Sequence, residues 1–313
     1  MLIDGFSMMA FVAATEPLRI ANRLLDQSAY EWSMIGAGRP NDAVVASNGM
    51  RVLPDAHMTT IETLPWLAVC SGFRSHVGSS TALYRWLARL DRQATTLGGI
   101  DTGCFALAEA GLLDGQVVTL HWESLPAFRE RFSAVTAVES LYETGDRRFS
   151  CAGGMAATDM MLADIRQRHG AALAAAVAEQ LIHARARVPD SRQRRSLVER
   201  LNSHDPVLVR AVALMESHIE SPLSLAEIAR RAGRSPRAVE RAFQAALGCS
   251  PGAHYRALRL ARARDLLRAT DRSMTDIALA CGFSSPARFS RVFKNHVGVA
   301  PSAWRRADQP AKK

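Results

Sequence analysis

The sequence predicts an α/β domain built on a mostly parallel sheet, followed by a smaller all-α domain. At 313 residues the chain has about the length of two domains, taking roughly 150 residues for each. Residues 1–184 alternate short β-like runs with helical stretches, which is the pattern of a parallel α/β sheet. After Pro206 the pattern contains short amphipathic helices separated by Gly, Ser and Pro, with no strand-like segment.

The elements expected in the first domain follow in chain order. Strands are expected at residues 32–37, 66–71, 94–100, 116–120, 134–140 and 148–152. Helices are expected at residues 8–25, 80–92, 102–110, 155–168 and 171–184. Residues 185–206 contain an arginine cluster and lack apolar periodicity, so we expect an interdomain linker there. The helical domain is expected over residues 207–306, and a disordered tail over residues 307–313.

Charge separates the two domains. Residues 205–313 hold 19 Lys and Arg against 9 Asp and Glu, a net +10, whereas residues 1–204 hold 20 against 21, a net −1. A small basic domain joined to a nearly neutral large one suggests that only the small domain binds a polyanion. The alternative is that its basic surface is solvated and binds no partner.

Composition indicates a globular protein of the cytoplasm. The chain has no run of 18 apolar residues and no signal-peptide pattern, so neither a membrane span nor secretion is expected. Its five cysteines are widely spaced without a CxxC pair, which is typical of reduced thiols and argues against disulfides or a zinc site. No cofactor is expected.

One pattern occurs twice in the C-terminal third, at residues 224–248 and 273–298. Each copy has a short helix with an acidic residue before Ile-Ala, then a glycine, then a Ser-Pro helix start, and ends at another glycine. Serine as N-cap with proline at the first helical position favours a helix start. Each copy therefore predicts a helix-turn-helix motif whose second helix can lie in the major groove of DNA.

The stretch between the two copies supports this pairing. Residues 251–269 have the apolar spacing of one helix of about 19 residues, about 28 Å long at 1.5 Å per residue. That length is close to the roughly 34 Å between successive major grooves. Two motifs joined by this helix can face adjacent grooves on one side of the duplex.

Residues 207–306 resemble an AraC/XylS-family DNA-binding domain. The resemblance rests on Ile277-Ala-x-x-x-Gly-Phe283, Phe289-Ser-Arg-x-Phe293-Lys and Gly298-x-x-Pro301-Ser-x-Trp-Arg305. By position, we expect these exposed DNA-facing residues on the two reading helices: Arg237, Glu240, Arg241, Gln244, Ser285, Ala287, Arg288, Arg291 and Lys294.

The chemistry of these side chains leaves two roles open. Each arginine can bind guanine bidentately or contact only phosphate, and Ser or Gln can serve either bases or phosphates. Ala287 either leaves room for close approach to the groove or is simply a good helix former. Phe243, Phe283, Phe289 and Phe293 have core spacing, so we expect them to face inward.

Residues 97–115 read as a strand, a sharp turn and a helix, the layout of a nucleophile elbow. Together with Gly5-Phe-Ser, Glu16-Pro-Leu-Arg-x-Ala-Asn22 and Thr119-Leu-His121-Trp122, this segment resembles the class I glutamine-amidotransferase-like (ThiJ/PfpI) fold, a flavodoxin-like parallel-sheet sandwich. Active relatives carry a cysteine at the elbow and an acid in the first helix. Here these positions hold Asp101 and Ala10, so we expect no thiol catalysis.

A crevice without a nucleophile suits a receptor, because an α/β fold keeps its crevice at the carboxyl ends of the strands. We expect ligand contacts from Asp101, Thr102, Cys104, Phe105, His121 and Trp122. Several of these residues have an alternative role. Cys104 is either a pocket residue or a small buried hydrophobe, and His121 is either a ligand contact or a structural histidine. The rings of Trp122, Phe105 and Phe73 either contact a quaternary ammonium or belong to the core. The helix start after the elbow would instead favour an anionic group.

The order of the two domains resembles the GlxA-type regulators. Residues 120–132, Cys151-Ala-Gly-Gly-Met-x-x-x-Asp159 and Arg192-Gln-Arg are similar to the subgroup that controls catabolism of arginine, carnitine and glycine betaine. The resemblance implies a transcription activator with a small amine or amino-acid effector, a homodimer formed through the α/β domain, and double-stranded promoter DNA and RNA polymerase as partners. An amidase or deglycase-like hydrolase fused to a DNA-binding module, and a ligand-independent architectural DNA binder, are the alternatives.

The first strand is short. Only Met1 to Asp4 precede Gly5, fewer residues than is usual in the family. Either the chain starts further upstream or the sheet edge is truncated, which would lower the stability of the domain.

Overall fold

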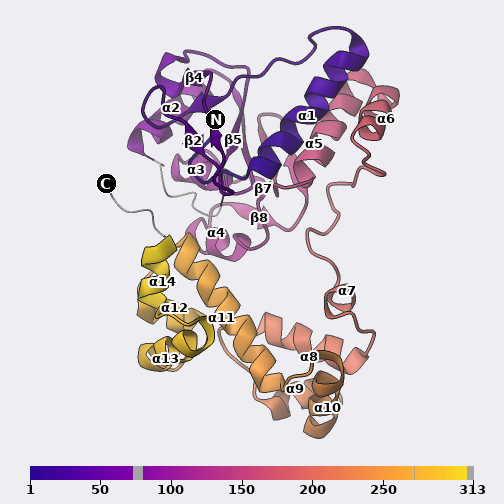
Figure 1. Ribbon diagram of the computed structural model, residues 1–313, viewed down its shortest axis with the longest axis vertical. Coiled ribbons are helices and arrows are strands. Elements are labelled where there is room, and N and C mark those ends of the chain that lie inside the picture. Colours follow the sequence, from indigo (N-terminus) through magenta and orange to yellow (C-terminus); the bar gives the residue numbers. More distant parts are fainter. Residues whose placement is uncertain (73–79, 271, 309–313) are drawn as a thin grey trace. The chain divides into compact units, whose positions relative to one another are not determined.

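The computed structural model describes residues 1–72, 80–270 and 272–308, which divide into two compact units (Figure 1). Residues 1–193 form the α/β unit, and the helical unit begins at residue 194. This boundary falls inside the stretch where the sequence predicts a linker. Within the described ranges, no helix is both long and apolar enough to cross a membrane.

A mainly parallel sheet forms the centre of the α/β unit. Its strands in spatial order are β5 (Trp66–Cys70), β6 (Thr96–Ile100), β10 (Arg148–Cys151) and β9 (Tyr142–Thr144). The first three run parallel, as predicted, and β9 runs antiparallel to β10. The sequence analysis did not predict β9, whose three residues Tyr-Glu-Thr lie between the two predicted strands 134–140 and 148–152.

Short strand pairs flank this sheet. β1 (Ile35–Gly36) pairs in parallel with β4 (Ala56–His57), β2 (Val44–Val45) pairs antiparallel with β3 (Arg51–Val52), and β7 (Val117–Thr119) pairs in parallel with β8 (Thr136–Val138). Leu2 makes parallel bridges to Gly36 and Cys70, so the first residues lie between β1 and β5. Leu2 forms only isolated bridges rather than a longer strand, and β1 and β4 lie beyond it.

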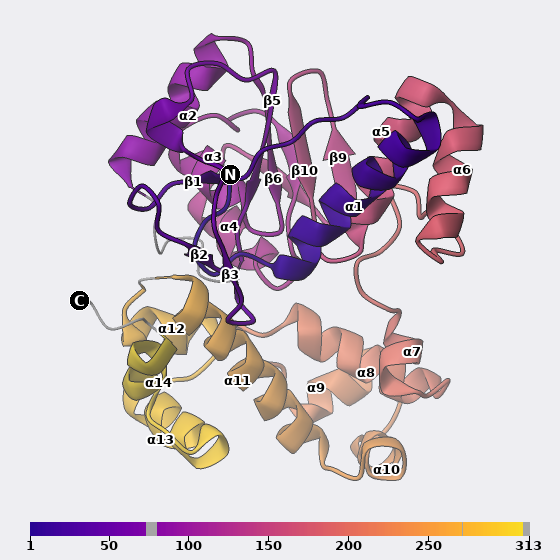
Figure 2. The same ribbon diagram turned by 45° about the horizontal axis from the view of Figure 1, so that its top comes forward.

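Helices cover both faces of the sheet (Figure 2). One face carries α2 (Thr81–Arg92) and α3 (Cys104–Glu109), and Leu83, Leu87 and Leu90 of α2 are fully buried against it. The other face carries α1 (Met8–Leu25), α5 (Ala156–His169) and α6 (Ala171–Gln180). The unit also contains the 3-10 turn η1 (Met58–Thr60) and helix α4 (Leu125–Arg131).

Two helix ends differ from the prediction because single residues adopt left-handed backbone. α3 starts at Cys104 rather than at 102, since Asp101 has φ +62° and begins a turn. α6 ends at Gln180, four residues earlier than predicted, and Ile182 has φ +53°. The other three predicted helices end within one residue of the observed bounds.

The predicted linker is more ordered than its composition suggested. Leu141 N donates a hydrogen bond to Pro189 O at 2.8 Å, so the first part of the stretch lies on the α/β unit. The second part contains α7 (Leu197–Leu201), which begins at a capping box between Ser196 and Glu199. The first contact joins residues far apart in the sequence, whereas the Ser196–Glu199 capping box is a local signal that the sequence analysis did not use.

The described residues of the helical unit form seven further helices. They are α8 (Pro206–Ser217), α9 (Leu225–Arg231), α10 (Pro236–Leu247), α11 (Pro251–Ala269), α12 (Met274–Ala280), α13 (Pro286–Val297) and α14 (Pro301–Asp308). α14 extends two residues into the predicted tail, and residues 309–313 lie outside the described ranges. In Figure 1, α11 runs from α8, α9 and α10 at one end to α12, α13 and α14 at the other.

The two helix-turn-helix motifs form where the sequence predicts them. Ser235 and Ser285 cap α10 and α13, each accepting a backbone N–H from three residues ahead, and both helices end at a left-handed glycine. The four phenylalanines expected in the core are buried, each no more than 4% exposed. The 19-residue helix α11 joins the motifs as predicted.

Candidate functional site

The first reading helix, α10, presents one polar face. Val239, Ala242 and Phe243 are buried on its inner side. The four predicted DNA contacts of this helix are all exposed: Arg237, Glu240, Arg241 and Gln244. Because residues three and four apart share a helix face, these side chains form a single surface.

The second reading helix, α13, repeats this arrangement. Phe289 and Phe293 are buried, and the predicted contacts Ala287, Arg288, Arg291 and Lys294 are exposed. Ser285 differs, because its hydroxyl oxygen accepts the Arg288 N–H at 3.3 Å as the N-cap. Its hydroxyl proton remains able to donate to an acceptor.

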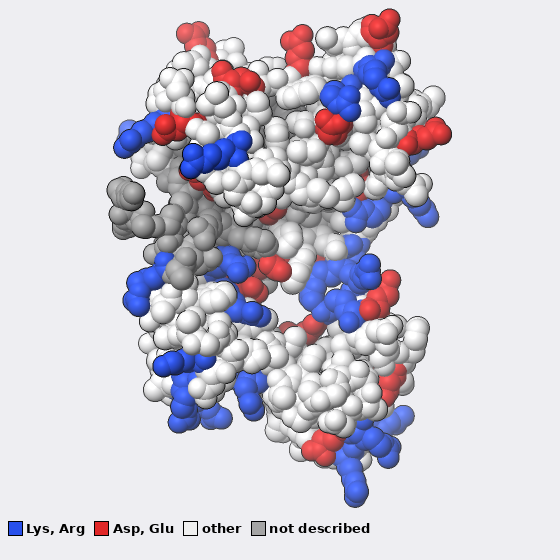
Figure 3. Space-filling model, viewed as in Figure 1, with Lys and Arg blue, Asp and Glu red and all other residues white. Residues whose placement is uncertain are grey.

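The basic side chains of both faces are available for a partner. Within the described part of the chain, no ion pair involves Arg237, Arg241, Arg288, Arg291 or Lys294. By contrast, Arg230 and Arg231 of α9 both pair with Glu227. Figure 3 shows Lys and Arg gathered over α10 and over α13, as a surface that contacts a nucleic-acid backbone requires.

Helix α11 fixes both motifs through side chains that the sequence analysis did not single out. The Tyr255 hydroxyl donates to His218 O at 2.5 Å and accepts the Leu223 N–H, next to the first motif. Arg259 donates to Cys281 O and Gly282 O at 2.7 and 2.6 Å in the turn of the second motif. Its guanidinium also lies 4.1 Å from the Phe283 ring centroid. Their spacing of four residues, on one helix face, was the available signal.

In the α/β unit, Asp101 stands at the elbow between β6 and α3. Its backbone N–H donates to Cys151 O at 2.9 Å, and its side chain packs so closely on Gly153 that a Cβ there would lie 2.8 Å from the Asp101 Cβ. The carboxyl is 6% exposed, and its Oδ1 has no hydrogen-bond partner among the described residues. Burial, and then the charge of Glu123, raise the pKa of Asp101 to about 7.

Three predicted ligand residues beside the elbow are used in the interior of the fold. Thr102 donates to Gly72 O, and Cys104 donates to Thr119 O at 3.5 Å. Phe105 packs edge-on against Phe128, with the ring centroids 5.0 Å apart. Burial raises the pKa of Cys104 to about 12, so its thiol stays protonated and matches the interpretation as a small buried hydrophobe.

His121 and Trp122 follow β7 and remain partly exposed. The backbone N–H of His121 donates to Asp101 O at 3.4 Å, which brings these two predicted residues together. Burial lowers the pKa of His121 below its usual value, so the ring is favoured in its neutral form. Phe73, the other predicted ring, lies outside the described residues.

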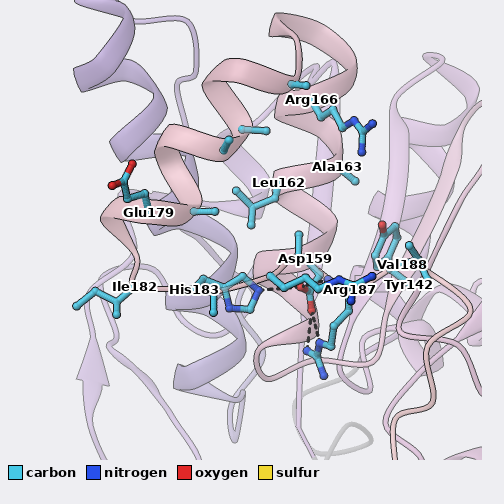
Figure 4. A pocket seen from close by; sticks show the side chains of 17 residues that line it. Tyr142, Asp159, Leu162, Ala163, Arg166, Glu179, Ile182, His183, Arg187 and Val188 are labelled. Carbon is cyan, nitrogen blue, oxygen red and sulfur yellow. Dashed lines mark hydrogen bonds and ion pairs between the residues drawn. The ribbon is translucent and has the colours of Figure 1, made fainter.

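A large pocket lies elsewhere in the α/β unit, between α5, α6 and residues 182–188 (Figure 4). Its volume is about 750 Å³, and its lining includes none of the six predicted ligand residues. On its floor, buried Asp159 accepts hydrogen bonds from His183 and from the backbone and guanidinium of Arg187 at 2.6–2.9 Å. This carboxylate therefore fastens the chain leaving α6 to the unit.

The helix that follows the elbow is shorter than expected. α3 has six residues, and its N-cap position, Gly103, makes no side-chain cap. The macrodipole of so short a helix is small, which weakens the expected preference of this end for an anion.

Comparison with known proteins settles the family. A sequence family described as a helix-turn-helix domain matches residues 228–307. Over 96% of this chain and 89% of the relative, the sequence is 43% identical to the HTH-type transcriptional regulator CdhR of Pseudomonas aeruginosa. Over 98% of this chain and 94% of the relative, it is 36% identical to the HTH-type transcriptional regulator GlxA of Rhizobium meliloti. The chain belongs to the GlxA-type family of AraC/XylS transcriptional regulators.

Two solved structures share a fold with part of this chain. An AraC family transcriptional regulator from Pseudomonas putida matches with a TM-score of 0.52 and 26% identity, over 57% of this chain and 96% of that one. A ThiJ/PfpI family protein from Pseudomonas syringae matches with the same TM-score at 18% identity, over 74% of this chain and 86% of that one, which shows the fold of the α/β unit. Both resemblances inferred from the sequence are confirmed.

Proposed function

We propose that this regulator binds promoter DNA in response to a small amine or amino-acid effector, which occupies the elbow of the α/β unit. The observation that carries the proposal is Asp101. It places a buried carboxyl, with a partnerless Oδ1, where relatives with catalysis carry a nucleophile. Burying a carboxylate without a counter-ion is unfavourable, so a cation at this position would gain a strong electrostatic contact.

His121, whose backbone N–H donates to Asp101 O, and the adjacent Trp122 suit the rest of such a ligand. Trp122 is partly exposed and offers a ring for an ammonium group, and neutral His121 can donate to or accept from a polar group. Thr102, Cys104 and Phe105 are buried and bonded or packed within the fold, so we propose direct ligand contacts from the other three residues.

DNA binding is assigned to α10 and α13, whose unpaired basic side chains suit phosphates and guanine edges. We further propose that the chain acts as an activator that contacts RNA polymerase, as a homodimer formed through the α/β unit, in the cytoplasm. Sedimentation of the full chain with and without operator DNA tests the dimer, and transcription in vitro with purified polymerase tests activation.

The hydrolase alternative has little support from the site. Asp101 replaces the nucleophile, Ala10 replaces its acidic partner and is fully buried, and the Cys104 thiol has a pKa of about 12. A thiol hydrolase needs an accessible cysteine with a lowered pKa. We therefore propose a receptor rather than an enzyme.

The test begins with a thermal-shift screen of the full chain against arginine, carnitine, glycine betaine, choline and sarcosine. A ligand at 100 times its dissociation constant adds about 2.7 kcal/mol to the free energy of unfolding. We expect a selective upward shift, absent from Asp101→Asn, which keeps the shape of the side chain and removes its charge. An operator selected from random duplexes by the full chain then serves to measure affinity with and without the amine.

Three results would count against the proposal. If no amine shifts the melting temperature, the amine class is wrong. If Asp101→Asn responds as the wild type does, the ligand binds elsewhere. If operator affinity is the same with and without every metabolite, the chain is an architectural DNA binder.

A further inference from the structure

Gln193, the final residue of the α/β unit, is held by the ends of two strands. The two N–H protons of its half-buried amide are shared among three acceptors, which lie 3.0 Å (Thr119 Oγ1), 3.0 Å (Leu120 O) and 2.7 Å (Ser140 O) from Nε2. The Thr119 hydroxyl itself donates to Ser140 O at 2.7 Å, so its oxygen is the acceptor towards Gln193. One amide thus bridges the chain beyond β7 and beyond β8.

The same strand end is bonded to the elbow on its other side. Cys104 Sγ donates to Thr119 O at 3.5 Å, and His121 N donates to Asp101 O at 3.4 Å. Residues 119–121 therefore contact the elbow and Gln193 at once. A displacement of this segment by a ligand on Asp101 and His121 would move the acceptors of the Gln193 amide.

The chain on either side of Gln193 makes this contact a junction. Before it, Arg187 is bonded to Asp159 and Pro189 to Leu141, which fastens the segment to the α/β unit. After it, Ser196 and Glu199 cap α7, and Arg200 pairs with Glu216 of α8 within the helical unit. A movement of Gln193 would therefore act on the residues that lead directly into the helical unit.

The Gln193 amide is only partly satisfied. The Gln193 Oε1 is buried and has no hydrogen-bond partner among the described residues. Leaving a buried acceptor unmet is unfavourable, so release of the amide to water regains a hydrogen bond at Oε1 while it loses those at Nε2. Coupling between sites requires an element with two arrangements, and the held and the released amide would be such a pair.

We propose that Gln193 is a positioning residue that couples occupancy of the elbow to DNA binding by the helical unit. The proposal rests on the function proposed above. A ligand seated against Asp101 and His121 shifts residues 119–121, and the Gln193 side chain transmits the shift to residue 194 and onward. Gln193 itself touches neither ligand nor DNA.

A double-mutant cycle in the full chain tests the coupling without any ligand. The dissociation constant for the selected operator is measured by fluorescence anisotropy for wild type, His121→Ala, Gln193→Ala and the double variant. We expect the effect of His121→Ala to differ between the two Gln193 backgrounds by about twofold or more. Equal effects in both backgrounds, including no effect in either, overturn the proposal.

A second arm uses glycine betaine or whichever amine of the screen shifts the wild type. In the wild type and in the exposed neighbour control Asp190→Asn, we expect the amine to change operator affinity about fivefold or more. Gln193→Ala removes the amide, and the carboxylate of Gln193→Glu cannot donate to Thr119, Leu120 or Ser140. We expect both variants to keep the thermal shift caused by the amine and to lose the change that the amine causes in operator affinity. Retention of that change in both variants overturns the proposal. If no amine shifts the wild type, the amine function fails, and the cycle alone decides the role of Gln193.

Discussion

Two glycines at equivalent positions of the motifs, Gly233 and Gly282, provide a matched test of how the helical unit is assembled. Both have positive φ, +68° and +70°, in the turn before the reading helix. A Cβ at Gly233 would meet nothing within 4 Å, whereas a Cβ at Gly282 would lie 2.5 Å from Ile219 O and as close to the Pro222 ring. Gly282 therefore lies where the second motif packs against the α8–α9 connection of the first.

The expected costs follow from these surroundings. Gly233→Ala forces alanine into left-handed backbone, which costs about 1–2 kcal/mol. Gly282→Ala has the same cost and adds an overpacking cost of about 1–3 kcal/mol, because backbone and a proline ring cannot move aside easily. We expect the second variant to lose about 1–3 kcal/mol more of the free energy of opening than the first.

Hydrogen exchange followed by mass spectrometry on peptides from α12 and α13 measures this free energy in the full chain. The operator dissociation constant, measured in parallel, is expected to rise more for Gly282→Ala, because the clash changes the placement of α13 relative to α10. Equal losses in the two variants would refute the argument that the motifs are joined by close packing at Gly282.

Three further predictions concern the proposed sites. If Arg241 or Arg291 reads a base, its replacement by alanine is expected to weaken operator binding by about 1–3 kcal/mol and to relax specificity at one base pair. Fluorescence anisotropy on several duplexes measures both effects. A loss of equal size on all duplexes would make the arginine a phosphate contact. The pKa of Asp101 rises on folding from 3.8 to about 7. Between these two pH values the folded chain holds a proton that the unfolded chain has lost. The free energy of unfolding therefore falls as pH rises through this range, by on the order of 4 kcal/mol. Chemical denaturation between pH 4 and 8 measures this difference. As pH rises, we expect the free energy of unfolding of Asp101→Asn to increase relative to that of the wild type. If the two free energies change with pH in parallel, the carboxyl is not buried in solution. At pH 8, iodoacetamide is expected to modify the partly exposed Cys249 and to leave Cys104 unmodified, as mass spectrometry can show. Rapid alkylation of Cys104 would instead support the thiol hydrolase function.

Much of the candidate DNA interface could be predicted because its signals are local. A serine cap acts on an N–H three residues ahead, and the terminating glycine acts on the preceding turn, so Ser285 and Gly298 mark the ends of α13 by themselves. Helical periodicity then separates Phe289 and Phe293 from the exposed Arg288 and Arg291. No distant contact is needed for any of these inferences.

The ligand site was predicted less completely, because its properties depend on neighbours brought from elsewhere in the chain. The elbow pattern located Asp101, but the pKa of its carboxyl depends on burial and on Glu123. Thr102 and Phe105 looked equally suitable as contacts, and only packing shows that both are taken up in the interior.

The sequence by itself determined the two-domain order, the family, the paired motifs and the loss of the elbow nucleophile. The tertiary structure decided which residues join these parts: Arg259 contacts the turn of the second motif, Gly282 packs on the α8–α9 connection, and Gln193 contacts the strand end beside the elbow. The physical reason is the sequence separation over which each kind of interaction acts. Caps, turns and periodicity act within a few residues, whereas a buried amide or guanidinium acquires its role from the carbonyls that folding places around it.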